Sequence, residues 1–222
     1  MATYISIIIS TKNNENEIEN TLQPLQALRA IGHEVIVCDG GSRDHTVAMA
    51  RPLCDMMLQD QRSWGDRINA GANVAHHPIF LFLHPNIRLP VDAMDQISDG
   101  LRKSRRVWGG FRITQREIGI TAFLRDMESR LSDIYRADQA IFVTRSGFAL
   151  AGGVPLLPIL EDVAFSMALQ KLGPPLRIEK PVKLLSPPIS LEQFWLSFKL
   201  RQAFAKGAKP ASLAKLYNLE SE

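Results

Sequence analysis

Residues 34–46, EVIVCDGGSRDHT, are the most informative part of this chain. An apolar run ends abruptly at Asp39, and two glycines, a serine and Asp44 follow it. Glycine permits a sharp turn and a close approach of the backbone to a ligand, and Asp44 with Thr46 can cap a following helix. The stretch predicts a strand that delivers the Asp39 carboxylate to its carboxyl end, where open α/β sheets bind nucleotides. A purely structural turn between a strand and a helix would use the same residue types.

Apolar runs of strand length alternate with segments of helical periodicity on both sides of this stretch. Strands are expected at residues 4–10, 34–38, 56–58 and 79–84. Helices are expected at residues 18–28, from 44 onward and at 68–75, with Gly32 as a C-cap. This alternation is typical of right-handed βαβ units and a mostly parallel sheet. Beyond Pro90 we expect a helix at 91–103, a strand at 107–113, a helix at 120–135, a strand at 139–144, and C-terminal helices at 191–206 and 210–217.

The composition fits a globular protein of one domain. The chain has 222 residues, 45% of them hydrophobic and 22% charged, which is enough for a core without disulfides. Cys38 and Cys54 lack the spacing of a metal site. No apolar run reaches membrane-spanning length and the N-terminus lacks a signal-peptide pattern, so we expect a cytoplasmic protein. The net charge of +3 suits an anionic nucleotide or an anionic membrane surface. Nucleic-acid binding is disfavoured because the sequence has no stripe of basic residues interleaved with aromatic ones.

Four blocks of sequence resemble family 2 glycosyltransferases. They are SIIISTKN at 6–13, VCDGGSRDHT at 37–46, NAGA at 69–72 leading to FLFLH at 80–84, and DQAIFV at 138–143 followed by Glu161 and Asp162. The chain is similar in particular to the small branch described as radical-SAM/selenodomain-associated, or arsenosugar-biosynthesis, transferases. The resemblance implies a GT-A fold, a Rossmann-like three-layer α/β fold with a mostly parallel central sheet and C-terminal helices. It implies one domain over 1–222, with a nucleotide-binding half to about residue 90, an acceptor half over about 91–190, and C-terminal helices over about 191–222.

The resemblance also implies roles for individual residues. Asp39 would bind the nucleoside, and Glu161 and Asp162 would be the catalytic carboxylates, with Asp162 as the base. For Asp162 the structural alternative is a carboxylate that the dipole of its helix favours; for Asn13 it is an ordinary turn residue. The further residues that we expect in the donor pocket are Thr11, Asn13, Gly41, Arg67, His84 and Gln139.

The metal position departs from the family pattern. Relatives usually place an aspartate after a His-Ala pair at the end of the fourth core strand, whereas this chain reads His84-Pro85-Asn86. Mg²⁺ is typically held by carboxylates together with substrate phosphates. A neutral Asn86 therefore predicts weak binding of Mg²⁺ or Mn²⁺. The cations that could face the donor diphosphate instead are Arg43, Arg62, Arg67 and Arg88.

The expected activity is transfer of a sugar from a nucleotide diphosphate sugar to the hydroxyl of a small or lipid-linked acceptor, with inversion. One alternative is a nucleotide-binding relative with impaired catalysis, because the substitutions cluster on the donor side. Another is a nucleotidyltransferase, which residues 10–15 disfavour because they contain no glycine. Aromatic and basic residues alternate in the C-terminal helices, which predicts contact with a membrane or a second subunit, or burial of the aromatic side in the protein's own core.

Overall fold

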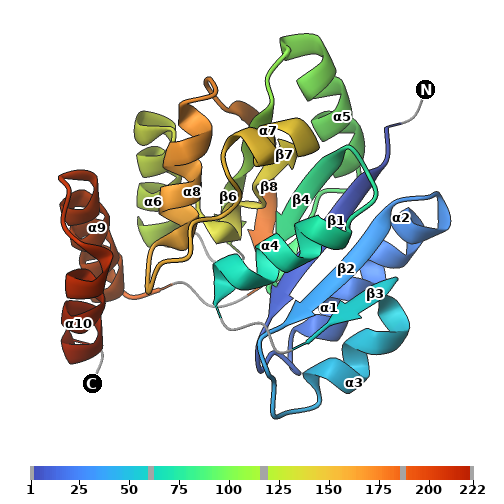
Figure 1. Ribbon diagram of the computed structural model, residues 1–222, viewed down its shortest axis with the longest axis horizontal. Coiled ribbons are helices and arrows are strands. Elements are labelled where there is room, and N and C mark those ends of the chain that lie inside the picture. Colours follow the sequence, from blue (N-terminus) through green and yellow to red (C-terminus); the bar gives the residue numbers. More distant parts are fainter. Residues whose placement is uncertain (1–2, 60–62, 116–119, 186–188, 221–222) are drawn as a thin grey trace.

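The computed structural model describes residues 3–59, 63–115, 120–185 and 189–220 (Figure 1). A sheet with the strand order β3-β2-β1-β4-β7-β6-β8-β5 forms the centre of the molecule. The strands are β1 (Ile5–Thr11), β2 (Glu34–Asp39), β3 (Met56–Leu58), β4 (Ile79–Leu83), β5 (Ile87–Arg88), β6 (Trp108–Gln115), β7 (Phe142–Thr144) and β8 (Leu176–Leu184). The pairs β1–β2, β1–β4, β2–β3 and β6–β8 are parallel, whereas β7 runs antiparallel to β4 and β6, and β5 antiparallel to β8. The predicted mostly parallel α/β sheet is confirmed.

Helices cover both faces of this sheet. They are α1 (Ile18–Leu22), α2 (Gln26–Ala30), α3 (Thr46–Ala50), α4 (Trp64–Val74), α5 (Ala93–Ser104), α6 (Ile120–Ser132), α7 (Arg145–Leu150), α8 (Glu161–Gln170), α9 (Leu191–Ala205) and α10 (Pro210–Glu220). Short 3-10 turns are η1 (Gln23–Leu25), η2 (Arg51–Leu53) and η3 (Ala137–Gln139).

The core lies in two layers because successive side chains of a strand point to opposite faces. In β1, Ile7 and Ile9 pack with residues of α1, α3 and α5 on one face, and Ile8 packs with residues of α4 and α8 on the other. Every residue of β1 is buried, as expected for a central strand covered on both sides. Helix, sheet and helix therefore form three layers (Figure 1).

Several elements differ from the expectation. The helix expected at 18–28 is divided by η1, where Pro24 occupies the first turn and lacks a backbone N–H donor. The helix expected from residue 68 begins at Trp64, and Gln139 lies in η3 before β7 begins. β5, β8 and α7 were not expected. Gly32 follows α2 with φ of +105°, which confirms its role at the C-terminus of that helix.

The C-terminal helices α9 and α10 lie side by side at one end of the molecule, next to α6 and α8 (Figure 1). Phe194 of α9 is buried in the protein, whereas the neighbouring Trp195 is 51% exposed. The aromatic residues are thus only partly used in the core. Among the described residues, no helix combines the length and the apolar character that crossing a membrane requires.

Candidate active site

Polar side chains gather at the edge of the sheet where β1, β2 and β4 end. The chain runs from β1 outward to β2 and β3 and then returns to the other side of β1 as β4. Such a reversal is a topological switch point, and open α/β sheets bind ligands in the crevice there. Thr11 ends β1, Asp39 ends β2, and His84 follows β4. The structure therefore brings these three predicted residues to one edge.

Asp39 is held by its own turn. Its side chain is buried, and the residue is 1% exposed. Oδ2 accepts hydrogen bonds from the backbone N–H groups of Gly41, at 2.9 Å, and Ser42, at 2.8 Å, while the Ser42 hydroxyl donates to Oδ1. Gly41 has φ of +80°, a conformation that side chains other than glycine rarely adopt. The carboxylate is thus a fixed acceptor whose first role is to order the loop.

A second set of hydrogen bonds joins the loops that follow β1 and β2. The Asn13 backbone N–H donates to Ser42 Oγ at 2.8 Å, and Asn13 Oδ1 accepts from the Arg43 N–H at 2.9 Å. Thr11 Oγ1 donates to Asn14 Oδ1 at 3.0 Å. Thr11 and Asn13 therefore lie beside the Asp39 turn as predicted, but their side chains serve first to fasten the two loops.

The helix α3 begins at Thr46 after the N-cap residue His45, which makes no side-chain capping hydrogen bond, and Asp44 bonds to the start of the helix from one residue earlier. Asp44 Oδ1 accepts a hydrogen bond from the backbone N–H of Thr46 at 3.0 Å. The Thr46 hydroxyl in turn accepts from the N–H of Asn14 at 2.7 Å. The Thr46 hydroxyl also donates to Asp44 Oδ1, and this bond, together with those from the backbone N–H groups of Thr46 and Glu15, lowers the pKa of Asp44. The hydrogen bonds at the start of α3 thus also connect the loops that follow β1 and β2.

Arg67 of α4 brings a cation to this edge. A capping box at Ser63 and Asp66 starts α4 and thereby fixes the position of Arg67 one turn into the helix. Arg67 Nε donates to Ser10 Oγ at 2.6 Å, which anchors the guanidinium at the end of β1. Burial lowers the pKa of Arg67, and the nearby carboxylates of Glu161 and Asp39 oppose that shift. Arg67 therefore carries its charge between the two acidic positions of the site. Arg62 lies outside the described residues.

His84 and Asn86 contact each other after β4. His84 Nδ1 lies 2.7 Å from Asn86 Oδ1, and burial lowers the pKa of the imidazole. A neutral ring that donates from Nδ1 to the amide oxygen satisfies both observations. No group of three His, Cys, Asp or Glu side chains in the part of the chain that the structure describes is arranged to hold a metal ion. The amide and imidazole around Asn86 thus do not fit the carboxylate-rich donor set of Mg²⁺.

Glu161 and Asp162 start α8 and differ in their surroundings. Glu161 is buried and accepts hydrogen bonds from Ser63 Oγ at 2.8 Å and from the Gly65 N–H at 3.0 Å. Its carboxylate therefore caps α4, which favours a structural role over the predicted catalytic one. Asp162 is half-buried, and its Oδ2 accepts from the Ala137 N–H at 3.0 Å. Asp162 also lines a cavity of about 360 Å³, so it is the more accessible of the two carboxylates.

Gln139 lies in η3 beside the end of β4, but its side chain is engaged with the main chain. It is 0% exposed, its Oε1 accepts from the Arg136 N–H at 3.1 Å, and its Nε2 donates to the Phe111 carbonyl at 3.5 Å. Both amide atoms thus bond to the main chain of the fold. These contacts favour a structural role for Gln139 over the predicted contact with the donor.

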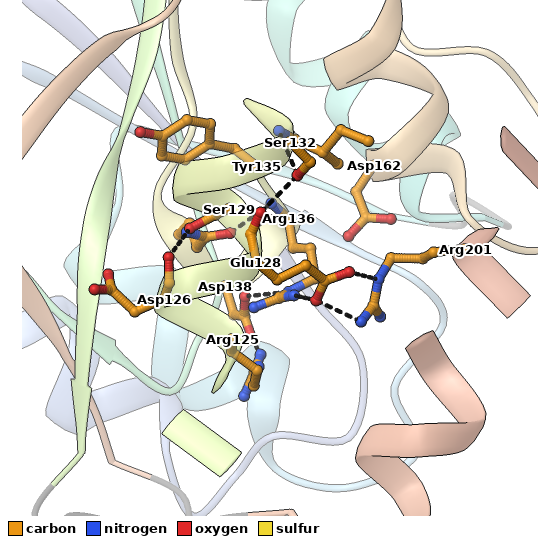
Figure 2. A network of polar contacts seen from close by, with 12 residues as sticks. Arg125, Asp126, Glu128, Ser129, Ser132, Tyr135, Arg136, Asp138, Asp162 and Arg201 are labelled. Atoms are coloured by element: carbon orange, nitrogen blue, oxygen red, sulfur yellow. Dashed lines mark hydrogen bonds and ion pairs between the residues drawn. The ribbon is translucent and has the colours of Figure 1, made fainter. Parts of the chain in front are cut away.

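Buried arginines near Asp162 were not predicted from the sequence. Figure 2 shows Arg125, Arg136 and Arg201 around Glu128 and Asp138, with the Asp162 side chain directed toward this group. They come from α6, from the segment before η3, and from α9, so no local spacing connects them. A sequence signal was nevertheless present in the arginine at 201, which stands among the apolar residues of α9.

Solved structures share this fold. S. aureus TarS 1–349 has a TM-score of 0.67 at 16% identity, over 95% of this chain and 68% of that chain. The mannosyltransferase PcManGT from Pyrobaculum calidifontis, in complex with GDP-Man and Mn²⁺, has a TM-score of 0.67 at 18% identity, over 99% and 69% of the two chains. Mannosyl-3-phosphoglycerate synthase from Rubrobacter xylanophilus has a TM-score of 0.66 at 13% identity, over 92% and 75%. The protein thus has the α/β architecture of the GT-A glycosyltransferases.

The sequence comparison defines the family. Residues 6–144, more than half of the chain, match the sequence profile of Glycosyl transferase family 2. No curated protein sequence matches the chain. The protein belongs to glycosyl transferase family 2, and the resemblance of the strand-end motifs to that family is confirmed.

Proposed function

We propose that the protein transfers a sugar from a nucleotide diphosphate sugar to a hydroxyl group of an acceptor. The observation that carries this proposal is the position of Arg67, anchored on Ser10 and electrostatically coupled to Asp39 at the switch point of the sheet. A cation there can neutralise a departing diphosphate while the Asp39 turn accepts hydrogen bonds from the nucleoside. Among the neighbours in fold, TarS 1–349 has been solved with UDP-GlcNAc and PcManGT with GDP-Man and Mn²⁺.

The proposed reaction is a single displacement with inversion. Asp162 takes the proton of the acceptor hydroxyl, the oxygen forms a bond to the anomeric carbon, and the bond from that carbon to the diphosphate breaks. The electron pair of the broken bond leaves with the nucleoside diphosphate, whose negative charge Arg67 stabilises. Asp162 suits the role of base because the Ala137 N–H fixes its orientation and the cavity gives it access to an acceptor.

The organisation of the chain follows from this assignment. One domain would contain a donor half to about residue 90 and an acceptor half over about 91–190, with α9 and α10 beside the acceptor half. Within family 2, the sequence blocks favour the small radical-SAM/selenodomain-associated branch. The half-exposed Trp195 of α9 leaves contact with a membrane surface or a second subunit as a further expectation.

A second candidate function is nucleotide binding with impaired turnover. It is favoured by Asn86, whose neutral side chain pairs with His84 where a carboxylate would support a cation. In this case a metal contributes little to donor binding, and transfer is slow.

Calorimetric titration with UDP, GDP and their sugars, with and without Mn²⁺, tests the proposal together with an assay for sugar transfer and donor hydrolysis. Tight binding with turnover supports the transferase, and binding without turnover supports the second candidate. A protein that binds none of these nucleotides would contradict both.

A further inference from the structure

Three arginines lie close together where α9 packs beside α6. Arg125, Arg136 and Arg201 are 9%, 8% and 8% exposed, and arginine is rarely buried to this degree without full pairing. Burial, together with the like charges of Arg125 and Arg201, lowers the pKa of Arg136 to about 9. The surroundings of Arg136 therefore do not fully compensate its positive charge.

The acidic residues around these arginines do not satisfy all of the guanidinium N–H donors. Glu128 accepts from Arg136 Nη1 at 3.1 Å and from Arg201 Nε and Nη2 at 2.8 and 2.7 Å (Figure 2). Asp138 pairs with Arg125 and lies 3.6 Å from Arg136 Nε, which is too far for a hydrogen bond. Among the described residues, three buried side-chain atoms of this group have no hydrogen-bond partner: Arg136 Nε, Arg136 Nη2 and the acceptor Asp138 Oδ1. An unsatisfied donor on a buried charge is costly, so an acceptor that fills this place stabilises the site.

A cavity adjoins this group of side chains, and Arg136 and Arg201 form part of its wall. Its volume is about 360 Å³, and its polar lining consists of Arg136, Asp162, Ser197, Arg201 and Tyr217. Aliphatic side chains from the segment before α8 and from α9 complete the wall. The size is that of a small-molecule site with a few polar groups in an apolar wall. The same cavity thus contains the proposed base and two guanidinium groups.

We propose that this cavity is the acceptor subsite and that it binds a phosphate group of the acceptor, with Arg136 and Arg201 as its ligands. The inference rests on the proposed function, because it takes Asp162 as the base. Guanidinium presents planar, always charged donors that match phosphate oxygens. An acceptor held by its phosphate at the arginines would place a neighbouring hydroxyl near Asp162. The phosphate belongs either to a small metabolite or to a lipid headgroup.

Ser197 gives a test that leaves the buried arginines in place. It lies four residues before Arg201 on α9, and residues so spaced share one face of a helix. Ser197 is half-buried at the cavity wall. Ser197→Asp would bring a negative charge that pairs with Arg201 and repels an anion, whereas Ser197→Ala removes only the hydroxyl. Arg201→Gln is a second variant, interpreted only if its melting temperature shows a folded protein.

The experiment measures binding of inorganic phosphate, glycerol 3-phosphate and dihexanoyl phosphatidic acid by calorimetry. The wild type and Ser197→Ala should bind alike, and Ser197→Asp and folded Arg201→Gln should bind at least about tenfold more weakly, as expected when a buried charge contact is lost. UDP and GDP binding should not change in Ser197→Asp. Tighter binding of glycerol 3-phosphate would identify a small acceptor, and tighter binding of the phosphatidic acid a lipid acceptor.

The outcomes separate this inference from the proposed function. Absence of phosphate binding to the wild type, or equal binding by Ser197→Asp and Ser197→Ala, would overturn the subsite. The protein could bind phosphate, lose that binding in Ser197→Asp, and yet bind no nucleotide sugar. This result would support the anion site and overturn the proposed glycosyl transfer.

Discussion

The Glu161 carboxylate accepts a hydrogen bond from the backbone N–H of Gly65, with 3.0 Å between Oε2 and N. This bond ties the start of α8 to the start of α4, where the unpaired N–H groups and the helix dipole favour a carboxylate. Ser63 Oγ and the Leu157 N–H donate to the other oxygen of the same group. Two adjacent acidic residues thus divide their tasks, since Glu161 holds the fold and Asp162 lies at the cavity.

Glu161→Ala should therefore destabilise the protein. A buried donor that loses its acceptor costs about 1–3 kcal/mol, so we expect the free energy of unfolding to fall by roughly 2 kcal/mol or more. Urea unfolding measures this loss. Asp162→Asn is the control, because its side chain is only half-buried and keeps an oxygen for the Ala137 N–H. An unchanged urea midpoint in Glu161→Ala would show that the carboxylate is not needed to join the helices.

Asp39→Ala should weaken nucleotide binding and also lower stability. The variant leaves the N–H groups of Gly41 and Ser42 without their acceptor, at a cost of about 1–3 kcal/mol. Calorimetry with UDP and GDP measures binding, and urea unfolding measures stability. Ser42→Ala is the control, since it loosens the turn but keeps the carboxylate. If Asp39→Ala and Ser42→Ala bind nucleotide equally well, the Asp39 carboxylate is not a ligand.

Asn86→Asp should strengthen metal-dependent nucleotide binding. The wild type should bind Mn²⁺ weakly without nucleotide, and a carboxylate at this position should raise Mn²⁺ affinity by about tenfold or more. The new charge would lie beside His84 Nδ1, so it should also raise the pKa of that imidazole, which NMR titration reports. Asn86→Gln supplies the neutral control. Tight Mn²⁺ binding by the wild type, with no gain in Asn86→Asp, would place the cation elsewhere.

Stability should fall as the pH drops below about 6.5, in part because of His33. Its Nδ1 accepts a hydrogen bond from the Ile5 N–H at 3.1 Å, which requires an unprotonated nitrogen, and burial together with nearby His77 lowers its pKa. The unfolded chain then binds more protons than the folded one as the pH falls, so the free energy of unfolding decreases. Urea unfolding at pH 7 and pH 5 measures the decrease in the free energy of unfolding, which should be smaller in His33→Gln than in the wild type. An identical decrease in the two proteins would show that His33 does not contribute to the pH dependence of stability.

The sequence was sufficient for the donor half of the fold because its signals are local. β1, β2 and β4 are apolar runs, and Asp39, Gly41 and Asp44 mark the turn that follows β2. β8 was missed because residues 176–184, LRIEKPVKL, combine four charged residues with a proline. That pattern disfavours a strand, and the pairing of β8 with β6 and β5 decides its structure.

The acceptor side depends on contacts between distant residues, which sequence patterns do not show. Glu161 caps a helix that begins almost a hundred residues earlier in the chain. Its position next to Asp162 in the sequence therefore gave no indication of this structural role. Arg136 and Arg201 meet at Glu128 only after α9 has packed beside α6. Arg136 alone resembles a solvated surface residue, and only the apolar surroundings of Arg201 in α9 give a local signal.

We propose Asp162 as the base of a glycosyl transfer by this chain. The direct measurement compares transfer of radiolabelled sugar from UDP- and GDP-sugars to phosphate-bearing acceptors by the wild type and by Asp162→Asn, with donor affinity determined in parallel. We expect Asp162→Asn to lose about 10²-fold or more in turnover, the usual contribution of a general base, while its donor affinity stays unchanged. Turnover by Asp162→Asn close to that of the wild type would contradict this assignment.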